Sequence, residues 1–426
     1  MSSLVYGTTG TFRRRYDIVT SPADYPLSTL WPTTFLAAPS AVPLLPIGRH
    51  HDMRMHKIAV AGLIVLPLLL TACGDDGDTG DSGTSGNGES SAAADGGKVG
   101  VILPDAASSP RWENNDRPAL QKAIEAAGYE AIIQNAGKDV TKFSSLCDSM
   151  INQSVNVLMI VNLDSESGAA CEKKAKDAGI ASIDYDRLTL GGSADYYVSF
   201  DNVQVGKLMG DGLAACLDTA GKTKANIAYI NGDPTDNNAA LFKEGYAGAL
   251  QPTIDSGDYT LVGDQTGKWD ATVAQTTFEQ IFTQNDGKID GVISANDTMA
   301  GGIVTVLNNN KLAGEVPVTG QDASDEGLQR VVAGTQCGTV FKDVNLEAEA
   351  AAKLAIAILK NDGSADALVN GEVEDTQAGK MVKSVFATPV WVTQDNINEP
   401  FDAGYTTVDK VCTADFADAC TKLGLS

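Results

Sequence analysis

Histidine is almost absent from this chain of 426 residues. Its three histidines are His50, His51 and His56, so everything after residue 56 contains none. That part of the chain has no imidazole for acid–base catalysis, for a Ser-His-Asp triad or for a metal site. It also has no Gly-x-Gly-x-x-Gly run after its first predicted strand and no Walker loop, so a phosphate cradle is not expected. Its chemistry must rest on carboxylates, amides, Arg, Lys and aromatic rings.

Basic residues are scarce. The chain has 31 Lys and Arg against 55 Asp and Glu, which gives a formal net charge of −24. A surface with this charge repels polyphosphate, so we expect no nucleic-acid partner. The charge fits a small neutral or cationic ligand better than an anionic one.

Only seven cysteines are present, and none forms a Cys-x-x-Cys pair. Without Cys73, which is discussed below, six remain, an even number that suits disulfides in an oxidising compartment. Cys412 and Cys420 lie only eight residues apart, a spacing that predicts a local disulfide between them. The other four cysteines allow further pairings, with buried thiols as the alternative. Cys147 and Cys171 lie on neighbouring predicted helices, which favours a disulfide between them. That pairing leaves Cys216 to pair with Cys337.

An apolar stretch from Ile58 to Leu70 follows the basic residues Arg54 and Lys57. It has about 13 residues, too few for the ~20 that a membrane-spanning helix needs, and is typical of a signal-peptide core. The run that closes it, Leu70-Thr71-Ala72-Cys73-Gly74, resembles a bacterial lipobox. The resemblance implies that Cys73 is lipidated and becomes the first residue of the mature chain. The alternative is a buried helix that ends in an ordinary cysteine.

These features divide the N-terminal region into three parts. We interpret residues 1–52 as a leader from a mis-assigned start, with a genuine extended leader as the alternative, and residues 53–72 as a lipoprotein signal peptide. Residues 73–97 hold the lipidated cysteine and a Gly, Ser and Asp linker that has almost nothing to bury. The Asp spacing of this linker does not fit an EF-hand, so we expect no metal site and no cofactor. The protein would then be extracytoplasmic and anchored to the cell membrane by its lipid alone, on the periplasmic side if an outer membrane exists.

From Lys98 onward, short β-rich runs alternate with amphipathic helical segments. This alternation predicts parallel sheets built from right-handed βαβ units. We expect strands at 99–103, 130–134, 155–161 and 181–185, and then near 225–230, 259–263, 289–294 and 316–320. We expect helices near 114–127, 141–153 and 166–178, and then near 202–217, 237–250, 270–284, 298–310 and 324–333.

The two series of elements indicate two α/β domains, because roughly 330 residues are too many for one such core. The first series ends and the second begins near Ser199–Asn202, and the last elements, from about 343, must complete both. We therefore predict a first domain of residues 98–203 with about 343–388. The second domain is predicted to comprise residues 204–342 with about 389–426.

Polar and aromatic side chains follow nearly every predicted strand, at the edge where open α/β sheets bind ligands. Any one Asp or Asn there is also a common helix N-cap, and Asp297 is expected to cap the helix that starts at Thr298. Carboxylates, amides, Arg and Lys together match the hydroxyls of a sugar, and an aromatic ring covers its C–H face. The clusters are Arg111-Trp112, Asp186-Arg187, Asp233–Asn238, Trp269, Asn296-Asp297, Gln321-Asp322 and Lys342.

Residues 98–400 resemble the periplasmic sugar-binding proteins of ABC importers, of the ribose and galactose type, and among them the members that bind D-xylose. The segments that carry the resemblance are Ser109–Trp112, Tyr185–Arg187, Ser199–Asn202, Pro234–Ala239, Gly263–Gln265 before Trp269, Ala295–Asp297 and Gly320–Ala323. The family implies two Rossmann-like domains with parallel sheets, a hinge of three strands and a ligand cleft between the domains, the type I periplasmic binding protein fold. The segment Gln265–Trp269 looks shorter than in the family and lacks a second aromatic residue.

The resemblance also implies which side chains contact the ligand. Trp112 and Trp269 would sandwich a sugar ring. The contacts would come from Arg111, Asp186 and Arg187 in the first domain, and from Asp236, Asn238, Asn296, Asp322 and Lys342 in the second domain or the hinge.

The function implied is the capture of one monosaccharide, with D-xylose favoured, by a monomer that closes its cleft and delivers the sugar to an ABC permease. No catalytic residue is expected. The first alternative is a sensor that presents bound sugar to a chemoreceptor or sensor kinase. A secreted glycosidase with two carboxylates and a sugar-responsive DNA-binding regulator are the others. A permease gene or a kinase gene beside this one would separate transport from sensing.

Overall fold

The computed structural model describes residues 96–425. The interpretations of the leader, the signal peptide, Cys73 and nearly all of the linker lie outside these residues. Within 96–425, no helix is long and apolar enough to cross a membrane.

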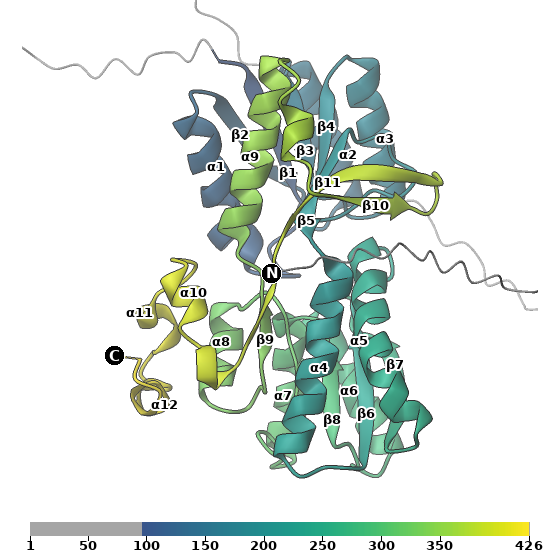
Figure 1. The fold of residues 1–426 in the computed structure, drawn as a ribbon, viewed down its shortest axis with the longest axis vertical. Helices are drawn as coiled ribbons and strands as arrows, with labels where there is room; N and C mark the ends of the chain where they lie inside the picture. Colours follow the sequence, from purple (N-terminus) through teal and green to yellow (C-terminus); the bar gives the residue numbers. More distant parts are fainter. Residues whose placement is uncertain (1–95, 426) are drawn as a thin grey trace, which may run out of the picture. The chain divides into compact units, whose positions relative to one another are not determined.

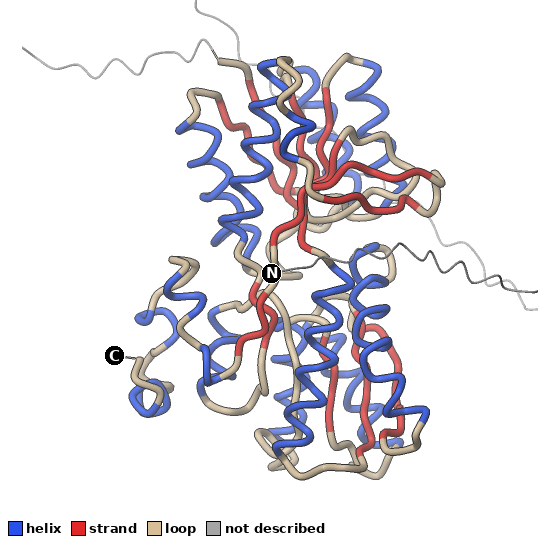
Figure 2. The backbone as a smooth tube through the Cα atoms, in the orientation of Figure 1, coloured by secondary structure: helices blue, strands red, loops and turns tan. Residues whose placement is uncertain are grey.

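Seven strands form the sheet of the first lobe, in the order β10-β11-β5-β4-β3-β1-β2. All neighbours run parallel except the hairpin of β10 and β11. Figure 2 shows these strands in red with helices on both sides. The strands are β1 (Lys98–Leu103), β2 (Glu130–Asn135), β3 (Val157–Ile160), β4 (Ala181–Tyr185), β5 (Tyr196–Phe200), β10 (Gly371–Asp375) and β11 (Lys380–Ala387).

Two helix pairs cover the two faces of this sheet (Figure 1). On one face, α1 (Arg117–Ala126) and α9 (Val344–Lys360) pack against the sheet through apolar side chains such as Leu120 and Leu354. On the other face, α2 (Val140–Asn152) and α3 (Ser165–Asp177) form a second core and are joined by a disulfide between Cys147 and Cys171. A short π-helical turn, η1 (Trp112–Asp116), precedes α1.

The second lobe has a parallel three-stranded sheet in the order β7-β6-β8. Helices α4 and α5 pack as one pair and α6 and α7 as another, around one apolar core. Helix α8 follows and packs on α7. The bounds are α4 (Asn202–Thr219), β6 (Ala225–Asn231), α5 (Asn237–Asp255), β7 (Tyr259–Thr266), α6 (Ala271–Gln284), β8 (Gly291–Ser294), α7 (Asp297–Asn309) and α8 (Asp325–Val332).

Helices α4 and α5 approach closely because glycines lie at their contact. A Cβ at Gly245 would come within 2.1 Å of the carbonyl oxygen of Val203, and one at Gly206 within 2.1 Å of that of Phe242. Any larger residue would push the helices apart, at a typical cost of about 1–3 kcal/mol. The contact matters for the site because the first turns of α4 and α5 carry Asn202 and Asn238 to the boundary between the lobes.

The chain crosses between the lobes three times. The crossings run from β5 to α4, from β9 (Thr339–Phe341) to α9, and from β11 to β12 (Val390–Val392). Strands β9 and β12 pair antiparallel with each other. Lys342 lies in the second crossing, directly after β9.

Residues 394–425, here called the C-terminal segment, contain only short helices: η3 (Gln394–Asn396), α10 (Glu399–Asp402), α11 (Val408–Val411) and α12 (Ala417–Lys422). A disulfide between Cys412 and Cys420 closes a loop within it, and a third disulfide joins Cys216 of α4 to Cys337. The three pairings are those favoured from the sequence. Figure 1 shows α10 and α11 beside α8, and α11 contacts α8.

The α/β class with mostly parallel sheets is confirmed. Three expectations about elements were wrong. Residues 316–320 do not form a strand but touch the sheet by one isolated bridge, between Val318 and Val292. The elements that were not expected include β5, β9, α9, β12 and the hairpin of β10 and β11. Helix α7 begins one residue earlier than predicted, so its N-cap is Asn296 and not Asp297.

Candidate functional site

A small buried cavity lies where the carboxyl ends of the strands of the two lobes meet. Its open volume is about 20 Å³, room for about one water molecule. The side chains of the two lobes therefore touch one another across it. All ten residues inferred from the resemblance line it, together with four others: Ser108, Ser109, Phe242 and Gln321.

Arg111 is the most heavily paired residue of the cavity. Its guanidinium binds Asp116 through two nitrogens, at 2.6 and 2.8 Å. It also donates to Asp186 at 2.8 Å and to Glu347 at 2.6 Å. All four side chains are at most 4% exposed. Because Asp116 and Glu347 hold the guanidinium from behind, its remaining edge faces Asp186 and the cavity.

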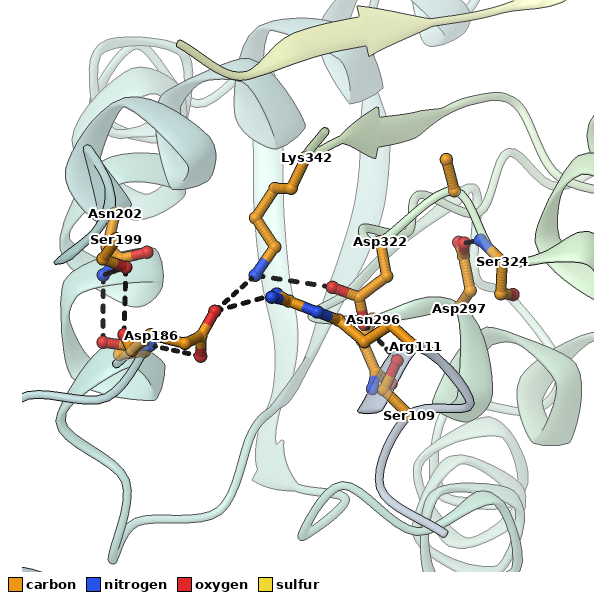
Figure 3. Close-up of polar contacts among 12 residues, drawn as sticks. Ser109, Arg111, Asp186, Ser199, Asn202, Asn296, Asp297, Asp322, Ser324 and Lys342 are labelled. Atoms are coloured by element: carbon orange, nitrogen blue, oxygen red, sulfur yellow. Dashed lines mark hydrogen bonds and ion pairs between the residues drawn. The ribbon is translucent and has the colours of Figure 1, made fainter. Parts of the chain in front are cut away.

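Lys342 joins the two lobes through a pair of carboxylates (Figure 3). Its Nζ lies 3.4 Å from Asp186 of the first lobe and 3.4 Å from Asp322 of the second. The other oxygen of Asp322 accepts a hydrogen bond of 2.8 Å from the hydroxyl of Ser109, which again belongs to the first lobe. The cavity is thus closed by ion pairs and hydrogen bonds that cross between the lobes.

Further polar contacts cross between the lobes around this centre. Arg187 of the first lobe pairs with Asp236 of the second at 3.0 Å. Asn238 donates to the backbone carbonyl of Asp186 at 2.9 Å, and Asn296 donates to that of Ser108 at 2.9 Å. Each contact uses a group that can equally bond to a ligand hydroxyl.

The two tryptophans of the cavity have different surroundings. The guanidinium of Arg111 lies 4.5 Å from the ring centre of Trp112, and that of Arg187 lies 5.6 Å away. Trp269 donates from its indole nitrogen to Asp236 at 3.2 Å and packs edge-on against Phe242. A Cβ on Gly232 would come within 2.0 Å of the Trp269 ring, so only glycine leaves room for it. The sandwiching of a sugar ring by the two tryptophans stays a prediction.

Three cavity residues have the left-handed backbone that L-residues rarely adopt: Asp186 (φ 62°), Trp269 (φ 53°) and Asp322 (φ 96°). Each such residue costs about 1–3 kcal/mol and persists where its surroundings hold it. At Asp186 the carbonyl accepts hydrogen bonds from Tyr197, Ser199 and Asn238. Residues with strained backbone cluster at functional sites, where side chains must be held in one direction. Three of them in one cavity favour a binding role for it.

The charges of the cavity lining balance. Three cations, Arg111, Arg187 and Lys342, face three carboxylates, Asp186, Asp236 and Asp322. Burial raises the pKa of Asp186, but the cations Lys342, Arg111 and Arg187 outweigh burial and lower this pKa to about 2. This side chain therefore stays ionised and accepts hydrogen bonds over the whole physiological range. A balanced set of strong donors and acceptors suits an uncharged ligand with many hydroxyls.

Within residues 96–425, no group of three or more His, Cys, Asp or Glu could hold a metal ion. The carboxylates of the cavity are occupied by Arg and Lys instead.

Sequence reasoning missed some residues of the site. Phe242 lies four residues after Asn238 on α5, and helical spacing places both on one face of that helix. Its ring contacts Trp269, so it supplies a second aromatic group near the short segment Gln265–Trp269. Asp116 and Glu347 carry no motif, since they reach the cavity only through Arg111.

Asn296 takes the capping role that was expected of Asp297 and also lines the cavity. Asn296 caps α7 by accepting from the backbone of Met299, while its amide nitrogen reaches across to Ser108. Asp297 is buried and accepts from Ser324, Gln336 and Thr339, so it fixes the loop that carries Asp322. The expectation that Asp297 caps the helix was wrong, because the helix starts one residue earlier.

Glu347 generates a prediction about pH. Burial raises its pKa to about 8, and Asp186 and Asp116 add to the rise, although Arg111 opposes it. The Glu347 carboxyl therefore keeps its proton up to about pH 8 in the folded state, whereas the unfolded chain releases it near pH 4.5. Stability falls by a few kcal/mol as pH rises between about 4.5 and 8. We expect Glu347→Gln, neutral at all pH values, to gain stability over the native protein as pH rises through this window.

Urea unfolding at pH 4.5 and pH 8 measures the difference. The control is Glu349→Gln on the same helix, whose exposed carboxylate pairs only with Lys353. A gap between Glu347→Gln and the native protein that stays constant with pH would contradict the assignment of a protonated Glu347.

Comparison with known proteins places this geometry in a family. Residues 99–363 match the family model of the periplasmic binding protein domain. The chain is 35% identical over 305 residues to the D-xylose-binding periplasmic protein of Escherichia coli strain K12, a match that covers 71% of this chain and 88% of that protein.

Two solved structures are similar as well. An ABC transporter solute-binding protein from Clostridium phytofermentans with bound β-D-glucose is 30% identical, with a TM-score of 0.67, and covers 74% of this chain and 99% of its own. A carbohydrate transporter solute-binding protein from Chloroflexus aurantiacus in complex with D-glucose is 29% identical, with a TM-score of 0.68, and covers 73% and 97%. These relatives are solute-binding proteins and not enzymes. With a family model that spans more than half of its residues, the chain belongs to the periplasmic binding protein family and has its type I fold.

Proposed function

We propose that the protein captures one monosaccharide, with D-xylose favoured, in the cavity between its lobes. The observation that carries the proposal is the charge-balanced lining of three cations and three carboxylates with two tryptophans beside it. The relative from Escherichia coli, named as a D-xylose-binding protein, supports the choice of pentose. The two similar structures hold glucose, so another pentose or a hexose is the alternative ligand.

In the proposed mechanism, sugar hydroxyls replace contacts that the protein now makes with itself. Asp186 and Asp322 would accept from hydroxyls, while Arg111, Arg187, Lys342, Asn238 and Asn296 would donate to them. Charge-assisted bonds of this kind are worth about 1.5–3 kcal/mol each. The rings of Trp112 and Trp269 would cover the two C–H faces of the sugar, and Asp236 would hold Arg187 and Trp269 in place.

Entry of the sugar requires the lobes to separate, because the cavity is buried in the arrangement described. Separation breaks the bonds that Ser109 makes to Asp322 and Asn296 makes to Ser108, and the three crossings provide the hinge. The hydroxyls of a bound sugar form hydrogen bonds to both lobes in place of these contacts, and so favour the closed arrangement. We propose that the closed monomer delivers its sugar to an ABC permease, with presentation to a sensor protein as the alternative.

The first test is a thermal-shift panel with D-xylose, D-ribose, L-arabinose, D-glucose and D-galactose. A ligand that binds only the folded state raises the melting temperature, so D-xylose is expected to give the largest shift. A larger shift with another of these sugars would keep the binding role and reject D-xylose. No shift with any of them would contradict the proposed function.

A second test addresses the stacking role of Trp269. Truncation in Trp269→Ala removes the ring, and we expect binding of the sugar to become undetectable in a calorimetric titration. Trp269→Phe, which keeps a smaller ring, should retain weaker binding. The matched control is Trp391→Phe, a tryptophan of β12 that packs against Gly212 and Gly338 away from the cavity. Equal affinity of Trp269→Ala and the native protein would reject the stacking role.

A third test concerns the membrane anchor, which the lipobox-like run ending in Cys73 supports. If Cys73 carries the lipid, Cys73→Ala should move the protein from the membrane fraction to the soluble fraction of cells that express the full chain. The control Cys412→Ala removes a cysteine of the C-terminal segment and should leave the protein with the membrane. Membrane association that survives Cys73→Ala would contradict lipid anchoring at this residue.

A further inference from the structure

The C-terminal segment covers the back of the ligand cavity. Its buried apolar side chains pack against α8, against β9 and against the first residue of α9: Ile397, Tyr405, Val411, Cys420 and Leu425. The disulfide between Cys412 and Cys420 closes a loop between Val411 and Leu425. The family model ends at residue 363, so this segment lies beyond it.

Tyr405 is the residue of the segment that reaches the cavity wall. Its hydroxyl donates to the backbone carbonyl of Asp322 at 2.9 Å. Its ring packs edge-on against Phe341, with ring centres 5.1 Å apart, and Phe341 directly precedes Lys342. Tyr405 is 5% exposed, and these two contacts place it next to the backbone of both Asp322 and Lys342.

The backbone that Tyr405 contacts is strained. Asp322 (φ 96°) and Ala323 (φ 52°) are consecutive left-handed residues. Three backbone N–H groups hold this turn: those of Asp322, Ala323 and Ser324 donate to Val340, Thr339 and Asp297, respectively. The hydroxyl of Tyr405 adds a fourth contact to this turn by donating to the carbonyl of Asp322. Loss of that bond would leave the peptide group after Asp322 held only by the long bond of 3.3 Å from its N–H to Thr339.

Tyr405 also contacts the first lobe. Its carbonyl oxygen accepts a hydrogen bond of 2.9 Å from the side chain of Asn115 in η1 (Trp112–Asp116), the same turn that carries Trp112. Next to it, Thr406 bonds to Asp325 at the start of α8. One residue thus touches both sides of the cavity without lining it.

We propose that Tyr405 is a positioning residue for the ligand cavity, whose hydroxyl holds the Asp322 carbonyl and so directs the Asp322 carboxylate at the ligand. The inference rests on the proposed function, since the ligand is taken to be a sugar that Asp322 contacts. It assigns a role in binding to the C-terminal segment.

The test is Tyr405→Phe, which removes the hydroxyl and keeps the ring against Phe341. We expect the affinity for D-xylose, measured by calorimetry well below the melting temperature, to fall roughly three- to tenfold, as loss of one hydrogen bond implies. The matched control is Tyr196→Phe, which removes a hydroxyl bonded to Asp366 outside the cavity. The control should bind as the native protein does. A Tyr405→Phe variant with a lower melting temperature and unchanged affinity would assign Tyr405 a structural role only and overturn the proposal.

Hydrogen exchange of the ligand-free protein gives a second readout that needs no sugar. The amide of Asp322, which donates to Val340, should exchange several-fold faster in Tyr405→Phe and at the native rate in Tyr196→Phe. Equal exchange in both variants would also overturn the proposal. If the native protein bound no sugar, the proposed function would fail, and the exchange rates alone would decide whether Tyr405 holds the Asp322 turn.

Discussion

The ion pairs of Lys342 with Asp186 and Asp322 are the interaction on which the rest of the structure depends. All three side chains are at most 4% exposed, and a buried charge is costly unless it is paired. Asp186 comes from the first lobe, where Arg111 also pairs with it, whereas Asp322 comes from the second and has Lys342 as its cationic partner. Lys342 lies in a crossing between the lobes. The bridge from Asp186 through Lys342 to Asp322 therefore forms only when the cleft is closed.

A hydroxylated ligand fits this constraint better than an ionic one. An anion or a cation would leave one member of the balanced set unpaired in a buried place, whereas a hydroxyl both donates and accepts. Residues around the cavity hold its charged side chains in the orientations that suit a hydroxylated ligand. Asp116 and Glu347 fix Arg111, Asp236 fixes Arg187, and the proposed contact from Tyr405 fixes the turn of Asp322. Holding these side chains in place requires strained, left-handed backbone at Asp186, Trp269 and Asp322.

Much of this could be predicted from the sequence, for identifiable reasons. The alternation of β-rich runs and amphipathic helices predicted all of the helices from α1 to α8. Clusters after successive strands pointed to one edge of each sheet, because parallel strands end there, and the resemblance to the sugar-binding family selected the ten cavity residues. Residues that act through a neighbour left no such signal. Glu347 and Tyr405 lie far along the chain from Arg111 and Asp322, and only the fold brings them together. Strands β10 to β12 were missed because no helix follows them to complete a βαβ pattern. Strands β5 and β9, which do precede helices, were missed as well, and β9 has only three residues.

A crystal structure grown with the sugar that gives the largest thermal shift tests the central claim most directly. The account predicts one sugar ring between Trp112 and Trp269, with its hydroxyls bonded to Asp186, Asp322 and Lys342. It also predicts that the ring replaces the contacts these side chains now make with one another. A sugar bound at any other place, with the ion pairs of Lys342 unchanged, would contradict it.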